Sequence, residues 1–425
     1  MNIKSVIASA VILAFTGIVS GRTGELVISC ADEKNDVVLL LSRNGYHPTR
    51  YSDPAEAVKN APVGSGVLIL SDDYPFSPGS VKPEVYELAM QKSLKLYVEY
   101  VDHIPGLKKA DGSVTIEYER AIVNSTVFGK RLNPMDILGV NGLVLKLEAS
   151  DPLIVLGKVA GVYKAEYGTD DVQTYPLLFE HNDMLIASTK LSGFATGRFG
   201  PKEAWETVWE YILAWLNSGT EYEFANGLSF VSPMFEKDGE LPTDAMKNAI
   251  VKGTDWLYKG RFLIDASWEQ FCRNMQMPGA GYGPYLDKDV KTGDGSLGII
   301  EGHGSKLYWN GTQQYRYCNR ADDNGQVAFA CAMTNRITGR SSDAIVASNL
   351  LDFLFYNSNV LSRGGDDPDN PCFGLMGWSD SEHSNHVYYG DDNARAILGA
   401  LGATACLNIW NWDREILETI LANFR

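Results

Sequence analysis

The sequence predicts a chain of two main parts, an α/β domain followed by an all-α domain. Short apolar strands alternate with amphipathic helices over residues 25–216, a pattern typical of a mostly parallel sheet covered by helices. After residue 242 the apolar positions recur at helical spacing instead. A short motif, Asp-Asp-Asn, also occurs twice in this second part. These observations predict a multidomain protein in which a mostly parallel α/β sandwich precedes an array of helical hairpins.

Length and charge restrict the class of protein. A chain of 425 residues exceeds one ordinary hydrophobic core, which favours at least two domains. The formal net charge of −16 argues against nucleic-acid phosphates and anionic membrane surfaces as partners, because both attract clustered Lys and Arg. We therefore expect no nucleic-acid partner.

The first 21 residues read as an export signal. Lys4 provides a positive start, and an apolar run over residues 6–19 follows it. The run is too short for a membrane span, so we expect an exported protein that is periplasmic or extracellular. Lipid attachment at Cys30 is a second-best reading, because a polar Gly24-Glu25 pair separates this cysteine from the apolar run. The six cysteines permit disulfides without forming a framework.

The first domain is expected over residues 22–218. Its expected strands are 25–30, 66–71, 94–101, 151–156, 162–167, 176–179 and 184–188, and its expected helices are 35–43, 83–93 and 201–216. In the last helix Trp205, Trp209 and Trp215 recur on one face, which favours core packing over sugar binding.

The order of these elements resembles the amidotransferase-like domains that accompany the catalytic domains of some secreted carbohydrate-active enzymes. An active amidotransferase would carry a cysteine on a sharp elbow after a strand, and Cys30 is followed instead by Ala-Asp-Glu. The resemblance therefore implies an accessory domain. Asp72, Asp73 and His103 are weaker site candidates, because they stand where strands end.

Residues 219–241 are polar and glycine-rich and read as a linker. The second domain, residues 242–425, contains five helical patterns, at 243–259, 324–338, 342–357, 393–409 and 414–423. No strand pattern of comparable strength lies between them, which predicts an all-α domain.

The Asp-Asp-Asn motif organises this second domain. Residues 320–326 read Arg-Ala-Asp-Asp-Asn-Gly-Gln, and residues 389–395 read Tyr-Gly-Asp-Asp-Asn-Ala-Arg, so that Asp391 follows Asp322 by 69 residues. Acids at these positions could simply stabilise helix starts. A cap needs one acid, however, so the second of each pair could bind sugar hydroxyls or transfer protons. Both interpretations stay open.

Each motif follows a long loop that is rich in aromatic and acidic residues, over residues 275–321 and 363–390. Loops of this length are usually functional or disordered, and their many Trp and Tyr residues argue against disorder.

The repeated motif, the Ala/Gly-rich helices that follow it and the aromatic loops together resemble the six-hairpin α/α toroids of glycosidases and some polysaccharide lyases. The resemblance implies that the loops before the inner helices line a sugar cleft. A complete toroid has about twelve helices, so the five helical patterns imply an incomplete or truncated toroid.

The resemblance implies a secreted enzyme that cleaves a glycosidic bond in an oligo- or polysaccharide. The catalytic candidates are carboxylates near the two helix starts: Asp322, Asp323, Asp392 and Glu382. The substrate-binding candidates, which could stack on sugars or hold hydroxyls, are Glu301, Trp309, Tyr317, Arg320, Trp378, His383 and Tyr389.

Two other functions stay open. A polysaccharide lyase would neutralise a uronate with Arg316 or Arg320 and remove a proton with His383, His386 or Tyr388. A noncatalytic glycan-binding protein would use the same aromatic and acidic residues. No cofactor and no metal site are expected, although Asp366, Asp367 and Asp369 could bind calcium.

Overall fold

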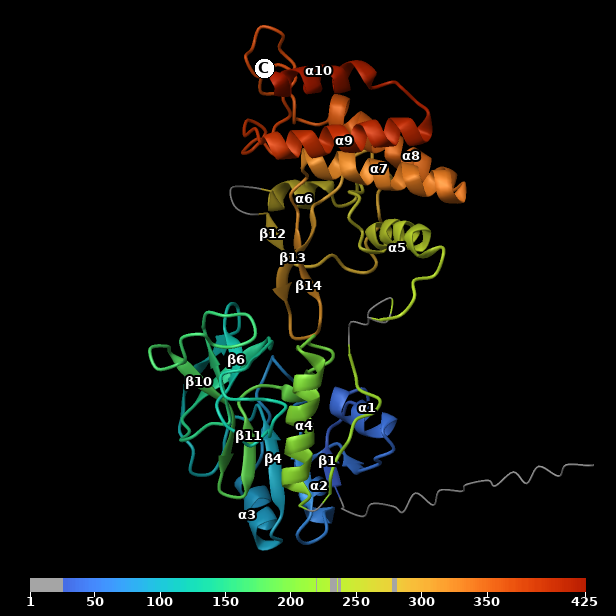
Figure 1. The fold of residues 1–425 in the computed structure, drawn as a ribbon. Coiled ribbons are helices and arrows are strands. Elements are labelled where there is room, and N and C mark those ends of the chain that lie inside the picture. Colours follow the sequence, from blue (N-terminus) through green and yellow to red (C-terminus); the bar gives the residue numbers. More distant parts are fainter. Residues whose placement is uncertain (1–25, 219, 230–234, 236–237, 277–280) are drawn as a thin grey trace, which may run out of the picture. The chain divides into compact units, whose positions relative to one another are not determined.

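The computed structural model describes residues 26–218, 220–229, 235, 238–276 and 281–425. The chain divides into two compact units, Met1–Ser229 and Phe230–Arg425 (Figure 1). The first unit combines a large sheet with helices and the second is mainly helical, which confirms the predicted multidomain α/β plus helical class in this general form.

A nine-stranded sheet forms the centre of the first unit. Its strands in spatial order are β2 (Thr49–Tyr51), β1 (Leu26–Ser29), β3 (Gly66–Ile69), β4 (Lys95–Glu99), β11 (Met184–Ala187), β10 (Thr174–His181), β9 (Ile154–Gly157), β6 (Arg120–Val123) and β7 (Ile137–Leu138). The first five are parallel to their neighbours, and the remaining pairs are antiparallel. A separate pair consists of β5 (Lys109–Thr115) and β8 (Leu143–Leu147).

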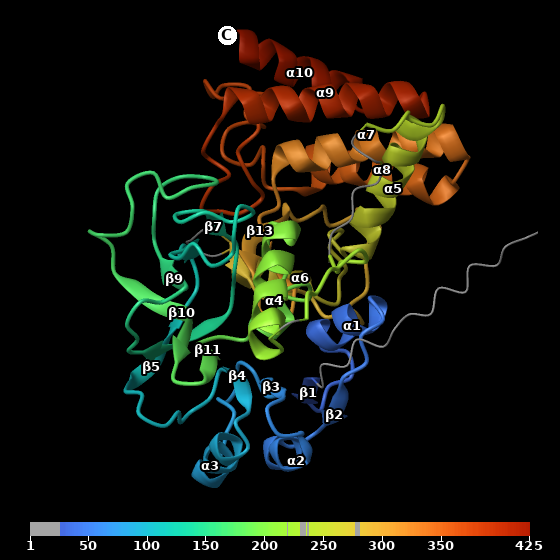
Figure 2. The ribbon, with the colours of Figure 1, turned by 60° about the horizontal axis from the view of Figure 1, so that its bottom comes forward.

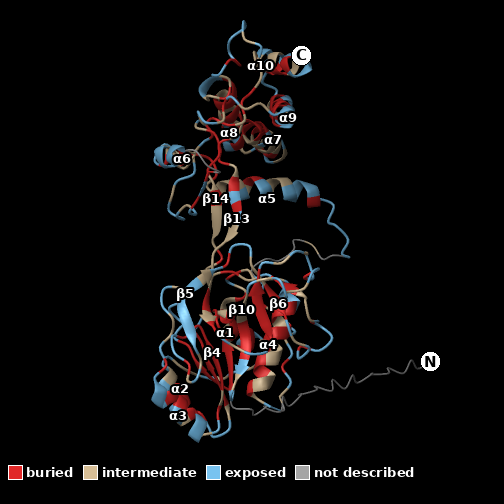
Figure 3. Ribbon diagram, turned by 90° about the vertical axis from the view of Figure 1, so that its left-hand side faces the viewer, coloured by how far each residue is buried: buried red, intermediate tan, exposed pale blue. Residues whose placement is uncertain are grey.

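Helices pack on this sheet. They are α1 (Asp36–Arg43), α2 (Pro54–Asn60), α3 (Pro83–Gln91) and α4 (Lys202–Leu216), with a short 3-10 turn η1 at Leu191–Gly193. Every residue of β1, β3 and β11 is buried, which explains their continuous apolar sequences. Figure 3 shows the same burial in β4, four of whose five residues are buried. Trp205 and Trp209 of α4 are fully buried, and the ring of Trp209 lies 5.4 Å from that of Tyr97. The prediction that the tryptophan stripe is core is confirmed for these two residues.

One expected strand of the first unit is wrong. Residues 162–167 form turns with a single bridge from Lys164 to Asp136, and Tyr163 and Tyr167 are 83% and 85% exposed. Their alternation of aromatic and polar residues therefore does not mark a half-buried strand. In contrast, β5 was missed because its sequence, Lys-Ala-Asp-Gly-Ser-Val-Thr, is polar and almost wholly exposed.

The second unit contains helices and one small sheet. Its helices are α5 (Ala245–Lys259), α6 (Glu269–Met275), α7 (Ala321–Thr338), α8 (Ser341–Asp352), α9 (Gly390–Leu407) and α10 (Asp413–Phe424), and α8 continues into a π-helical turn, η2 (Phe353–Asn357). The three-stranded sheet has the order β12 (Tyr282–Gly283), β14 (Gln313–Arg316), β13 (Gly302–Leu307). Figures 1 and 2 both show α9 lying between α7 and α10.

The small sheet and α6 correct the expectation of five helices without strands. The sequence of β13, Gly-His-Gly-Ser-Lys-Leu, contains two glycines and little apolar alternation, which explains why no strand was expected there. The described residues of this unit contain six α-helices rather than five.

The backbones of α7 and α9 approach closely where both helices carry small residues. A Cβ built on Gly325 of α7 would lie 2.5 Å from the carbonyl oxygen of Ala396 of α9, and a Cβ on Gly399 would meet the backbone of Gly325. Further along, Phe329 of α7 packs over Gly402 of α9. Contacts in this order mean that the two helices run in the same direction, with their first turns together.

Candidate site at the first turns of two helices

The four aspartates of the repeated motif lie in the first turns of α7 and α9. The residues at the N-cap positions are Arg320 and Tyr389, and neither makes a side-chain cap hydrogen bond. The acids therefore lie within the first turn of each helix and not at the cap position. In this first turn the positive end of the helix dipole still favours negative charge.

Arg320 joins the two helix starts. Its Nη2 donates to Asp392 Oδ1 at 2.6 Å and to Asp322 Oδ2 at 3.1 Å, and its Nη1 lies 3.6 Å from Glu301 Oε1. The side chains of Asp322 and Asp392 are 3% and 6% exposed. The two acidic motifs, 69 residues apart in the sequence, therefore lie side by side in the structure.

Two further arginines border the same carboxylates. Arg316 Nη1 donates to Glu301 Oε1 at 2.7 Å. Arg395 Nη1 lies 3.6 Å from Asp322 Oδ2 and 3.7 Å from Asp392 Oδ1. Three guanidinium groups therefore surround the acids, which share them rather than forming isolated pairs.

Aromatic rings cover the arginines. The Cζ atom of Arg320 lies 5.5 Å from the ring centre of Trp378, and that of Arg316 lies 5.8 Å from the same ring. Arg316 is also 5.4 Å from the ring of Tyr282. Cation–π contacts of this kind hold planar guanidinium groups against ring faces.

The asparagines of the two motifs fix the preceding loops. Asn393 accepts a hydrogen bond from the backbone N–H of Met376 at 2.9 Å and donates one to its carbonyl oxygen at 2.8 Å. Asn324 donates to Asn319 Oδ1 at 2.8 Å. An amide side chain both donates and accepts, so it can hold a loop backbone beside a helix start, as Asn393 does.

Burial changes the acidity of two aspartates. Burial raises the pKa of Asp322 to about 6, with a further increase from Asp392 and an opposing effect of Arg320. Burial also raises the pKa of Asp323 to about 7, and the neighbouring charge of Asp322 adds to it. Burial and the neighbouring charge of Asp322 therefore both favour the protonated form of Asp323.

Several polar atoms of the cluster have unused hydrogen-bonding capacity. Glu301 Oε2, Asp322 Oδ1 and Asp323 Oδ2 accept no hydrogen bond from a donor in the described part of the chain, and Arg320 Nε meets no acceptor there. Buried polar atoms are normally paired, so this concentration marks the cluster as more than a structural ion pair.

The structure places other predicted residues outside these contacts. Tyr317 is fully buried and donates to the carbonyl oxygen of Pro284 at 2.6 Å, so it is a core residue and not a surface for sugars. Glu382 and His383 are exposed on the second loop. Trp309 lies in the turn between β13 and β14, and Tyr389 is 50% exposed directly before α9.

Sequence reasoning did not count Arg395 or Tyr282 among the candidate site residues, and it considered Arg316 only as a partner for an anionic sugar. Arg395 follows Asp391 by four residues and Asp392 by three. Residues at these spacings are neighbours on a helix surface, so the sequence could have indicated that Arg395 pairs with these acids. Tyr282 carries no comparable signal.

The structure also bears on the possible calcium site, the cysteines and a membrane span. Asp366, Asp367 and Asp369 are exposed, and the described ranges contain no group of three or more His, Cys, Asp or Glu residues arranged to hold a metal ion. All six cysteines are free, and Cys30 is fully buried. Among the described helices, none has the length and apolar character to cross a membrane.

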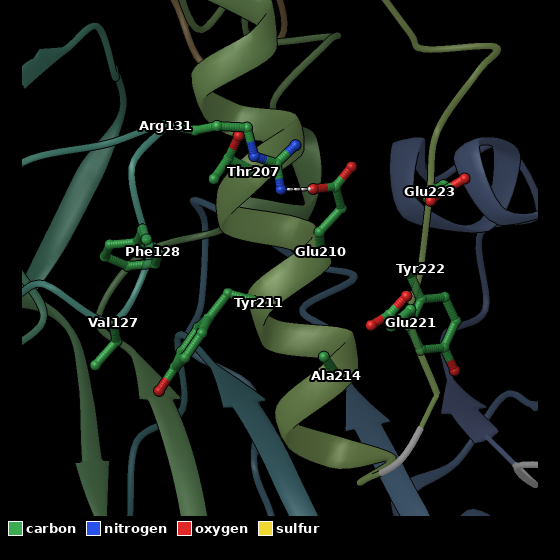
Figure 4. Close-up of a pocket in the computed structure, with 11 residues that line it drawn as sticks. Val127, Phe128, Arg131, Thr207, Glu210, Tyr211, Ala214, Glu221, Tyr222 and Glu223 are labelled. Carbon is green, nitrogen blue, oxygen red and sulfur yellow. Dashed lines mark hydrogen bonds and ion pairs between the residues drawn. The ribbon is translucent and has the colours of Figure 1, made fainter.

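The first unit contains a separate cavity of about 460 Å³ beside α4 (Figure 4). Arg131 forms an ion pair with Glu210 at the cavity, and the hydroxyl of Tyr211 donates to Glu180 at 2.9 Å. Its other lining residues include Phe128, Thr207, Tyr222 and Glu223.

The strand-end candidates of the first unit have structural partners or lie exposed. Asp72 accepts hydrogen bonds from the backbone N–H of Ala31 at 2.9 Å and from the thiol of Cys30 at 3.3 Å, and thereby holds the loop after β1. Asp73 and His103 are exposed.

Comparison with protein-family models finds no match to this chain, and comparison with curated proteins finds none either.

Proposed function

We propose that the protein is a secreted carbohydrate-active enzyme that hydrolyses a glycosidic bond in an oligo- or polysaccharide. The reaction takes place where α7 and α9 begin. The observation that carries the proposal is the position of Asp323, a half-buried residue directly beside the buried carboxylates of Asp322 and Asp392, where burial raises its pKa to about 7. Glycoside hydrolysis needs such a group, a carboxylic acid that still holds its proton near neutral pH.

In this proposal Asp323 protonates the leaving oxygen. Asp322 and Asp392 share a hydrogen bond with each other and contact the same nitrogen of Arg320, so they are too close together to stand on opposite sides of a glycosidic bond. They act as one unit that supplies the second, ionised carboxylate, which serves as base or nucleophile. Tyr389, which is 50% exposed directly before α9, provides a ring face for sugars next to these acids, and Trp378 holds the arginines beside them.

The helical arrangement supports the same reading. Two helices of equal length, α7 and α9, run in the same direction with their first turns together and long loops before them. This is what the resemblance to six-hairpin toroids implies for inner helices around a sugar cleft, and a partial toroid is part of the proposal. The first unit is proposed as an accessory domain.

A polysaccharide lyase is the second candidate, and the three arginines favour it. They would neutralise a uronate carboxylate. However, His383 and His386 are exposed on the loop, and Tyr388 donates to the carbonyl oxygen of Arg363 at 3.0 Å. The described contacts place none of these three bases against the cluster.

The test is a panel of neutral and uronic-acid glycans incubated with the whole protein. New reducing ends without absorbance from an unsaturated product support hydrolysis. Reducing ends together with absorbance indicate elimination, and binding without either product indicates a noncatalytic glycan-binding protein. The last two outcomes overturn the hydrolase proposal.

Asp323→Asn tests the proton donor. We expect kcat/KM to fall by about 10²- to 10⁴-fold, and we expect the wild-type decline in rate above about pH 7 to disappear from the residual activity. Asp413→Asn is the matched control, because it changes an exposed acid in the first turn of α10. Full activity of Asp323→Asn, with an unchanged pH profile, excludes Asp323 as the acid.

A further inference from the structure

An apolar stripe on α9 has no cover within the described part of the chain. Ala394, Leu398, Leu401 and Ala405 are all exposed, with Leu398 at 67% and Leu401 at 38%. Their spacing of four, three and four residues places them on one face of the helix. The stripe is the seam pattern of a two-helix coiled coil, in which apolar residues alternate at intervals of three and four.

The internal repeat identifies this stripe as a helix-packing face. The residues 69 positions earlier are Gly325, Phe329, Ala332 and Arg336 on α7. Two of them, Gly325 and Phe329, pack on α9 at Ala396, Gly399 and Gly402, and Ala332 is buried, whereas Arg336 is exposed. The face that α7 uses against α9 is therefore repeated on α9 and left uncovered.

The occupant cannot repeat the α7–α9 contact unchanged. At Gly325 a Cβ atom would lie 2.5 Å from the carbonyl oxygen of Ala396, and the equivalent residue of the stripe, Ala394, carries that Cβ. A helix crossing as closely as α9 crosses α7 would clash with this methyl group. The stripe therefore takes a helix at a wider separation.

The stripe is also self-complementary. Read in either direction it has the order Ala, Leu, Leu, Ala and the spacing four, three, four. In an antiparallel pair related by a two-fold axis, Leu398 of each copy faces Leu401 of the other, and Ala394 faces Ala405. This is the self-matching of one patch with itself that a two-fold interface requires.

We propose that a second copy of this chain docks on α9, with the two α9 helices packed antiparallel through Ala394, Leu398, Leu401 and Ala405. The interface removes two exposed leucines per copy from water, which provides the driving force. The proposal rests on the stripe and the repeat, and it does not need the proposed enzymatic activity.

Sedimentation velocity of the full chain tests the interface. We expect a dimer for the wild type and a monomer for Leu398→Glu, because the introduced charge would be buried against Leu401 of the second copy. Met246→Glu is the matched control, since Met246 is 82% exposed on α5, and it should stay dimeric. A monomeric wild type overturns the proposal, and so does a Leu398→Glu protein that remains a dimer.

Cysteine cross-linking tests the direction of packing. Ala394→Cys and Ala405→Cys chains, each with Cys372→Ser and Cys406→Ser, should form a disulfide with each other when mixed. Neither variant should form this disulfide by itself. In an antiparallel pair, residue 394 of one copy lies about 16 Å from residue 394 of the other, and the same holds for residue 405. Disulfides within the Ala394→Cys protein alone would show a parallel arrangement and overturn the antiparallel interface.

Discussion

The first turns of α7 and α9 share a backbone plan. Both helices contain 18 residues. In each, the asparagine of the motif donates to the carbonyl oxygen four residues earlier, at 2.6 Å for Asn324 and 3.1 Å for Asn393. Both also end at a left-handed residue, Gly339 or Asn408. The repeat therefore reproduces helix length, loop attachment and termination.

The side chains of the two first turns differ in their electrostatic roles. The residue before α7 is Arg320, whose guanidinium binds carboxylates of both helices, whereas the residue before α9 is the half-exposed Tyr389. The first acid of each motif also differs, since the side chain of Asp322 is 3% exposed and that of Asp391 is 65% exposed. The first motif supplies Arg320 and Asp322 to the network of ion pairs, and the second motif contributes Asp392 to it. The comparison teaches that a repeated backbone can hold an asymmetric site.

The largest expected effect comes from Arg320→Ala. At pH 8 we expect a loss of about 3–5 kcal/mol in the free energy of unfolding, because buried carboxylates lose their shared partner. Tyr389 is the N-cap residue of α9, as Arg320 is of α7, and Tyr389→Ala should lower the free energy of unfolding far less. The measurement is chemical denaturation of both variants, followed by a probe of the second unit.

Acid provides the internal check on Arg320. At pH 4 the aspartates can take up protons, and the penalty of Arg320→Ala should shrink. Equal losses for the two variants at pH 8 would mean that the two first turns are electrostatically equivalent, contrary to the comparison.

An intermediate effect is expected where the helices cross. Gly325→Ala should destabilise the protein by about 1–3 kcal/mol, since its methyl group meets the carbonyl oxygen of Ala396 at 2.5 Å. Ala394→Gly at the equivalent position of α9 should cost about 0.5–1 kcal/mol through helix propensity, because the methyl group of Ala394 is exposed within one copy of the chain. Thermal unfolding of both variants distinguishes them, and a neutral Gly325→Ala would show that the crossing can relax.

The sequence could predict the parts of this fold that depend on local pattern. Buried strands such as β1 and β3 appear as continuous apolar runs, and α4 appears as a tryptophan stripe. The starts of α7 and α9 were placed three residues late, because their first turns are polar and an apolar periodicity cannot show them. The small sheet was missed for the same reason.

The site was predictable to the extent that its residues repeat. The Asp-Asp-Asn motif indicated Asp322, Asp323 and Asp392, and Arg320 stood directly before it. The sequence could not show that Tyr317 points into the core, since an aromatic residue before a helix can pack or be exposed. Nor could it show which acid of each pair is buried, because that depends on how the two helices cross.

The smallest expected effect comes from Asp391→Asn. Its carboxylate is 65% exposed and pairs with the half-exposed Arg395, so we expect a change within about 0.5 kcal/mol. The informative readout is the pH dependence of the free energy of unfolding, measured between about pH 4 and pH 8 for the wild type, Asp391→Asn and Asp323→Asn.

The sign of that dependence follows from the two raised pKa values. Folding raises the pKa of Asp322 to about 6 and of Asp323 to about 7, from 3.8, so their contribution is fully present below pH 3.8 and is lost as pH rises through 6 and 7. Wild-type stability should therefore receive a falling contribution from these groups over this range. Asp391→Asn should keep the fall, and Asp323→Asn should flatten its upper part. If Asp391→Asn flattens the curve as much as Asp323→Asn does, the exposed acid of α9 is coupled to the cluster, and the asymmetry between the two first turns is smaller than their burial indicates.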